Sequence, residues 1–142
     1  MDDAELDELD ELEWTTAQRA AIERLGLEFL ADFYTAALAR RPGDLDALAD
    51  LANVYTQLGR IADGLRLDRE LVRRQPDAPD AHYNLACSLA LSGEPDAACT
   101  ALERAIELGY ADVEHLLADE DLASLRASAE FERLIARLRA SS

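Results

Sequence analysis

Residues 48–59 read LADLANVYTQLG, and residues 82–93 read HYNLACSLALSG. The second stretch begins 34 positions after the first and repeats identical residues in register, namely Leu51 and Leu85, Ala52 and Ala86, and Gly59 and Gly93. Pro42 and Pro76 are separated by the same 34 positions. Several pairs that share one period indicate a repeating structural unit of this length.

Each unit has the pattern of two helices. Apolar residues recur at three- and four-residue spacings from Leu48 to Tyr55, which is one face of a helix. Gly59 ends this helix, because glycine adopts the left-handed C-cap conformation at little cost. A second helix is predicted over residues 62–74. The next unit repeats the pattern, with Pro79 in the first turn of its first helix.

These residues resemble the tetratricopeptide repeat family, whose unit is a helix–turn–helix. The resemblance covers residues 45–110, and it is carried by the paired positions Leu48 and His82, Leu51-Ala52 and Leu85-Ala86, Tyr55 and Leu89, Gly64 and Ala98, and Pro42 and Pro76. It implies an all-α fold, a right-handed superhelical solenoid of about three repeats plus capping helices. In this family the first helix of each pair lines a concave surface that binds partners.

Asp68 departs from the family pattern. The family usually fills this position with an aromatic or another packed side chain. Because a lone buried charge is costly, we expect the Asp68 carboxylate to reach the surface or to pair with an arginine.

We expect a single domain over residues 14–142, with repeats at about 14–43, 45–78 and 79–112. The first repeat is degenerate. Thr15 and Gln18 form a capping box pattern before a helix over residues 16–25, and Gly26 is predicted to break it. A partner helix over residues 27–40 is expected to turn its apolar residues inward, namely Leu30, Phe33, Tyr34, Ala37 and Leu38.

A capping segment is predicted over residues 113–140, with short helices over 113–118, 122–126 and 129–139. It resembles the closing segment of bacterial arrays of this family. The end of a solenoid exposes an apolar face that must be covered. Its covering stripe is predicted to be Phe131, Leu134, Ile135 and Leu138.

Residues 1–13 carry eight carboxylates and no basic residue. We interpret them as an acidic, disordered leader. The alternative is a short amphipathic helix that docks on Trp14 and the first repeat or on a partner, because Leu6, Leu9 and Leu12 recur every three residues.

The formal net charge is −16, and all 14 basic residues are arginine. Such a field repels phosphate backbones and anionic membranes, so neither nucleic acid nor a membrane is an expected partner. No stretch approaches the roughly 20 apolar residues that span a bilayer. Cys87 and Cys99 do not make a disulfide framework, and we expect a cytoplasmic protein.

A partner-binding groove is predicted on the exposed face of the first helix of each pair. Its candidate residues are Asp46, Asp50, Asn53, Gln57, Asp80, Tyr83, Asn84 and Cys87. The aspartates favour Lys or Arg in the ligand, the asparagines suit a peptide backbone, and Tyr83 is the candidate anchor for an apolar side chain. The alternative is that these positions are merely solvated.

Some family members clamp a chaperone's C-terminal carboxylate with two asparagines and cationic residues. Asn53 and Asn84 match the asparagine positions, but Ala49, Glu114 and Ala118 hold the cationic ones. Asparagines alone cannot balance a carboxylate in so acidic a groove, so this ligand is not expected.

Catalysis is not expected either. His82 occupies a core position of the repeat, and His115 has no second ligand at metal spacing. Cys87 lacks a neighbouring histidine, and no glycine-rich loop could hold a phosphate. We therefore predict no catalytic, cofactor or metal residue.

The expected function is protein–protein interaction, as a scaffold or adaptor that holds a cationic protein or peptide. Two alternatives stay open. One is a dedicated chaperone for a secreted or assembled cationic protein, and the other is a self-assembling structural protein.

Overall fold

The computed structural model describes Asp3 and residues 14–141 of the 142-residue chain. Apart from Asp3, the predicted acidic leader lies outside the described residues. Residues 14–141 contain no strand, and their elements are α2 (Thr16–Arg40), α3 (Leu45–Gln57), α4 (Ile61–Arg74), α5 (Pro79–Leu91), α6 (Pro95–Glu107), α7 (Val113–Ala118), the 3-10 helix η1 (Glu120–Leu125) and α8 (Ala129–Ala140). The all-helical prediction is confirmed.

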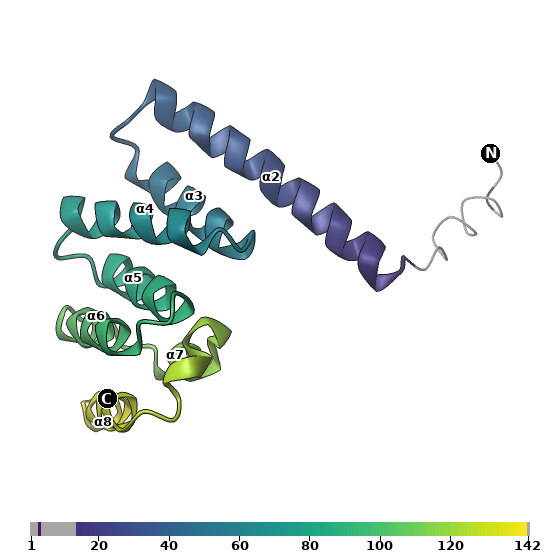
Figure 1. The fold of residues 1–142 in the computed structure, drawn as a ribbon. Helices are drawn as coiled ribbons and strands as arrows, with labels where there is room; N and C mark the ends of the chain where they lie inside the picture. Colours follow the sequence, from purple (N-terminus) through teal and green to yellow (C-terminus); the bar gives the residue numbers. More distant parts are fainter. Residues whose placement is uncertain (1–2, 4–13, 142) are drawn as a thin grey trace.

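Helices α3 to α6 form two stacked helix pairs. Each helix packs against the next in the chain (Figure 1). The turn within each pair uses a glycine of positive φ, 78° at Gly59 and 77° at Gly93, as the repeat pattern predicts. Gly64 lies where α4 crosses α3, and a Cβ there would be 3.1 Å from the Ala52 carbonyl oxygen. These pairs match the predicted tetratricopeptide architecture.

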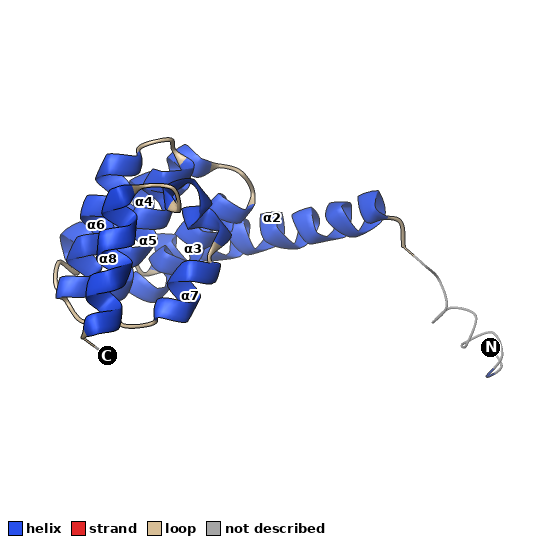
Figure 2. Cartoon of the chain, turned by 90° about the horizontal axis from the view of Figure 1, so that it is seen from below, coloured by secondary structure: helices blue, strands red, loops and turns tan. Residues whose placement is uncertain are grey.

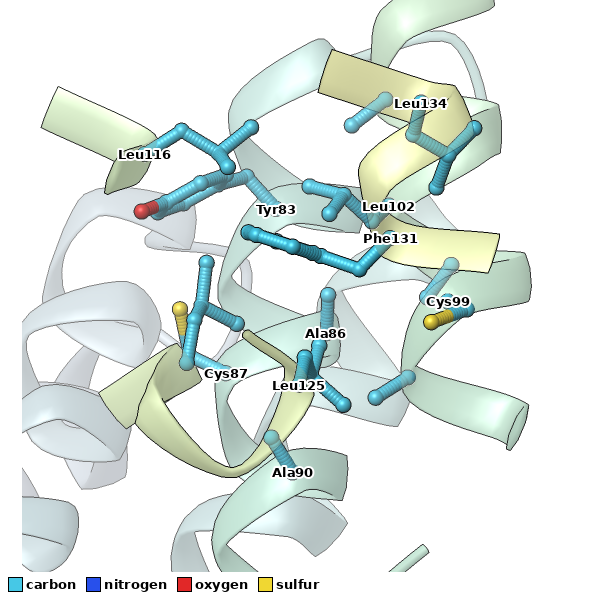
Figure 3. Close-up of a cluster of buried hydrophobic side chains, with 14 of the residues drawn as sticks. Tyr83, Ala86, Cys87, Ala90, Cys99, Leu102, Leu116, Leu125, Phe131 and Leu134 are labelled. Atoms are coloured by element: carbon cyan, nitrogen blue, oxygen red, sulfur yellow. The ribbon is translucent and has the colours of Figure 1, made fainter. Parts of the chain in front are cut away.

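The core consists of two clusters. The smaller one joins α2, α3 and α4 through residues such as Ala31, Leu51 and Leu71. The larger one joins α5, α6 and Leu65 of α4 to the capping segment, and its largest fully buried side chains include Leu102, Leu116 and Leu125 (Figure 3).

The predicted capping stripe lies in the larger cluster. Phe131, Leu134, Ile135 and Leu138 on α8 are all buried. Ser128 caps the start of α8, and its hydroxyl accepts from the Phe131 amide. The capping helices therefore cover the end of the array as predicted.

The first repeat is where the structure overturns the sequence prediction. Residues 16–40 form one continuous helix, so the predicted break at Gly26 is wrong. Thr15 and Gln18 do form the predicted capping box. A glycine inside a helix costs only about 1 kcal/mol, and the strong helix formers on both sides of Gly26 outweigh that cost.

The predicted burial along this helix is only partly correct. Tyr34 and Leu38 pack against the α3 cluster, but Leu30 is 37% exposed and Phe33 is 57% exposed. Figures 1 and 2 both show the N-terminal half of α2 projecting away from the stacked helices. Without a turn at Gly26, residues 16–25 do not fold back over Leu30 and Phe33, and this is why those two side chains stay exposed.

Candidate concave-face binding site

Helices α3 and α5 present most of the predicted groove residues to solvent. Asp46, Asp50, Asn53 and Gln57 recur at four- and three-residue spacings on α3 and are all exposed. Asp80 and Asn84 are exposed on α5. Six of the eight predicted residues therefore lie where a partner can reach them.

Tyr83 and Cys87 are the other two, and both are buried, with 5% and 7% of their surfaces exposed. The capping segment covers them. The Tyr83 hydroxyl donates to Asp119 Oδ2 at 2.6 Å, and the Cys87 thiol donates to the same oxygen at 3.7 Å. Figure 3 shows Leu116 of α7 beside the Tyr83 ring. Tyr83 is therefore not the exposed anchor that we predicted.

The sequence patterns missed this contribution of the capping segment. Its side chains Asp119, Asp121 and His115 reach the concave face. Nothing in their spacing links them to α5, because the contact joins residues 36 positions apart. Residues 113–140 cover the end of the array, as the sequence indicated. They also form part of the concave face, which the sequence did not indicate.

A pocket of about 350 Å³ lies between α3, α5 and the capping segment. Its lining combines carboxylates, amides and hydroxyls with a few apolar groups, and consists of Ala49, Asp50, Asn53, Thr56, Asp68, Tyr83, Asn84, Cys87, Ser88, His115, Asp119 and Asp121. A second hollow of about 650 Å³ adjoins it and shares Tyr83, Asn84 and His115. Among the described residues, no arginine lines either hollow.

Asp119 is the central acceptor of the pocket. Besides Tyr83 and Cys87, it accepts the Asp121 amide at 3.0 Å through Oδ1, and His115 Nε2 lies 3.7 Å from its Oδ2. Burial and the nearby Asp119 charge raise the pKa of Asp121. These carboxylates destabilise one another as anions, so a bound cation would relieve an existing repulsion.

The chemistry of Cys87 argues against nucleophilic catalysis at this pocket. Burial, together with the Asp119 and Asp121 charges, raises the pKa of the Cys87 thiol. A thiol that stays protonated is a poor nucleophile. Among the described residues, Cys87, Asp119 and Asp121 form a group that could hold a metal ion, because one ligand atom from each lies within 4.8 Å of the other two.

Asp68 forms part of the pocket lining from α4 and is only 4% exposed. The expectation that its carboxylate reaches the surface or pairs with an arginine is wrong. It accepts a hydrogen bond from the Ser88 hydroxyl on α5. Burial raises the pKa of Asp68 to about 6, and the Ser88 bond lowers it in part. The serine supplies the partner that a buried polar group needs.

Of the described helices, none is both long and apolar enough to cross a membrane. A tetratricopeptide repeat family model matches residues 13–79 and 49–113. Among curated proteins, a chloroplastic protein from Arabidopsis thaliana is 30% identical over 84 residues, which cover 57% of this chain and 25% of that protein. The chain thus spans about a quarter of the length of this relative. Because the family model covers most of the chain and α3 to α6 have the expected paired architecture, the chain belongs to the tetratricopeptide repeat family.

Proposed function

We propose that this chain is a cytoplasmic protein–protein interaction module that binds a basic protein or peptide segment on its concave face. The observation that carries the proposal is the pocket lined by Asp50, Asp68, Asp119 and Asp121. In the described residues no arginine contributes to this lining, so no guanidinium offsets the four carboxylates there, and His115 is the basic side chain beside Asp119.

The pocket suits one long basic side chain. Its volume of about 350 Å³ is near the lower end of the range for ligand sites, about 300–1,000 Å³. An arginine guanidinium entering from the solvent side meets Asp50, Asp119 and Asp121, and a planar guanidinium pairs with a carboxylate through two hydrogen bonds. The pocket therefore selects a side chain within an extended segment.

The residues at the rim suit the ligand backbone. Asn53 and Asn84 line the pocket from neighbouring helices and are both exposed. Each amide can donate and accept at once, so together they can hold one peptide unit of an extended chain. The net charge of −16 speeds the approach of a basic ligand and makes its binding sensitive to salt.

Binding without catalysis is the role that this chemistry supports. The raised pKa of Cys87 keeps its thiol protonated. Tyr83 and Asp119 are engaged with each other, which fixes the capping segment.

The test is fluorescence anisotropy with a labelled peptide that carries one arginine in a neutral, flexible sequence, at low and moderate salt. The variant Asp50→Asn removes one carboxylate of the pocket. We expect it to weaken binding about 5- to 10-fold, as for one charge-assisted contact at a partly exposed site.

A matched control removes the same charge elsewhere. Glu132→Gln, at an exposed position of α8, leaves the net charge equal to that of Asp50→Asn. We expect its affinity to stay within about 2-fold of the wild type, since distant exposed charges are screened. Equal losses in the two variants would show that the peptide responds to the overall field and would contradict the proposed site.

A further inference from the structure

The outer face of α2 is the largest apolar feature that the groove does not explain. We define the α2 outer face as Ile22, Leu25, Phe29 and Phe33, which are 51%, 65%, 70% and 57% exposed. Their spacings of three, four and four residues place them in one stripe along the helix. Leu30 borders this stripe and is 37% exposed, and Trp14, which precedes α2, is 52% exposed.

This face lies opposite the one that holds α2 to the domain. Leu27, Ala31, Tyr34 and Leu38 pack toward α3. At 100° per residue, the centre of that face is about half a turn from the centre of the α2 outer face. The helix is thus apolar on two opposite sides, whereas a surface helix ordinarily has one apolar face. Within residues 14–141, nothing covers the second side.

The amount of exposed apolar surface matches that of an interface. Aromatic and aliphatic side chains exposed to these extents offer on the order of 100 Å² each, so the face together with Leu30 and Trp14 offers roughly 600 Å². That is the upper end for patches on monomeric proteins, about 300–600 Å². Covering two such faces at once removes on the order of 1,200 Å² from water, the lower bound for a specific interface.

Charge distinguishes which occupant can approach. The chain has a net charge of −16, so two copies repel each other over most of their surfaces. Helix α2 adds nothing to this repulsion, because its three carboxylates, Glu23, Glu28 and Asp32, are balanced by its three arginines, Arg19, Arg24 and Arg40. A neutral apolar helix gives a basic partner no electrostatic advantage, and it lets the same helix of a second acidic copy approach without local repulsion.

We propose that the α2 outer face binds the same face of a second copy, so that two α2 helices pair antiparallel about a two-fold axis near residues 27 and 28. This register places Ile22 opposite Phe33 of the second copy. It places Phe29 over Leu25 and Gly26 of the second copy. A single contact of this kind is self-complementary and closed.

Gly26 explains why the two helices can approach closely. A Cβ on Gly26 would meet no atom within 4 Å, so this position faces open space in the single chain. A hollow of about 500 Å³ lies beside it, lined by Glu23, Gly26, Leu27, Leu30 and Gln57. On the outer face, the missing side chain at Gly26 leaves room for the Phe29 ring of the second copy. The glycine therefore serves as the contact point of the pair instead of the predicted helix break.

Sedimentation equilibrium of the full chain between about 1 and 100 µM tests the proposal. We expect the mass to approach twice the chain mass of 15.6 kDa at the upper concentrations. Phe29→Glu should weaken the dimer about 100-fold or more, because the change occurs twice in a symmetric contact. Leu91→Glu is the matched control, since Leu91 is 39% exposed on α5 and the added charge is the same. The control should keep the wild-type dimer constant.

Two further variants test which molecule covers the α2 outer face and where the two helices cross. Deletion of residues 2–11 should leave the dimer intact. Gly26→Gln adds a side chain that ends in a polar amide. It should weaken the dimer about 10-fold or more while circular dichroism shows undiminished helix content.

A wild type that stays monomeric at 100 µM would overturn the proposal and leave the face to a different protein. Loss of the dimer on deletion of the leader would overturn it in favour of that segment. An unchanged dimer constant in Gly26→Gln would show that the helices do not cross at Gly26. Equal weakening by Leu91→Glu would show that the dimer does not form through the α2 outer face. Peptide binding by Phe29→Glu should match the wild type, so the groove and the α2 face are tested separately.

Discussion

Replacing the buried carboxyl of Asp68 by an amide tests the electrostatics of the concave face most directly. Burial raises the pKa of this carboxyl from its ordinary value of 3.8 to about 6 in the folded chain. The folded state therefore holds the proton more tightly than the unfolded state does. The stabilisation from this group is complete below pH 4 and is lost as the pH rises through 6.

The size of the loss follows from the two pKa values. A tenfold change in proton affinity is worth about 1.4 kcal/mol, so the ionised form destabilises the fold by about 3 kcal/mol well above pH 6. About half of this, roughly 1.4 kcal/mol, develops between pH 5 and pH 7.5. Throughout that range the pH stays above the isoelectric point of about 4.3. The amide of Asp68→Asn does not titrate.

The assay is urea unfolding followed by circular dichroism at several pH values from 5 to 7.5. Urea is uncharged and leaves the electrostatic interactions unscreened. We expect the free energy of unfolding of Asp68→Asn minus that of the wild type to increase by about 1.4 kcal/mol over this range. Asp77→Asn, on the exposed turn after α4, is the control and should give a difference independent of pH. Parallel curves for Asp68→Asn and the wild type would refute the reasoning, because they would mean that water reaches the carboxyl in solution.

Three other substitutions test the packing, each by urea unfolding. Gly64→Ala should destabilise by about 1–3 kcal/mol, because the new Cβ lies 3.1 Å from the Ala52 carbonyl oxygen; a gain in stability would mean that α3 and α4 can move apart. Leu125→Ala should cost about 2–5 kcal/mol, since this side chain is fully buried in the larger cluster; a loss below 1 kcal/mol would indicate a loose cap. Tyr83→Phe should cost about 1–2 kcal/mol and speed amide exchange in η1 but not in α3; unchanged exchange in η1 would mean that the bond to Asp119 does not hold the cap.

The helix pairs could be predicted from the sequence because their signals are local. Glycine is favoured where a helix ends at a residue of positive φ, as at Gly59 and Gly93. The apolar stripe from Leu48 to Tyr55 determines which face of α3 packs inward. Gly64 could also be predicted, because the repeat pattern requires a small residue where the two helices of a pair meet.

The remaining features depend on contacts that no local pattern contains. Gly26 is compatible with both a turn and a helix interior, and the choice depends on whether residues 16–25 gain anything by folding back. The burial of Tyr83 depends on Asp119, which is 36 residues away and belongs to a segment with no repeat period. Asp68 has the same dependence on a partner from another helix, Ser88. The exposed groove positions could be predicted from the sequence, but the part of the groove that the capping segment covers could not.

The two core clusters also bear on how the chain folds as it is synthesised. Helices α2 to α4 leave the ribosome first, and they build most of the smaller cluster but supply only Leu65 to the larger one. The larger cluster is incomplete until α8 supplies Phe131 and Leu134. A nascent chain therefore holds the apolar sides of α5 and α6 open until nearly all of residues 14–141 have emerged. During that interval it needs the same protection from aggregation as any partly built repeat array.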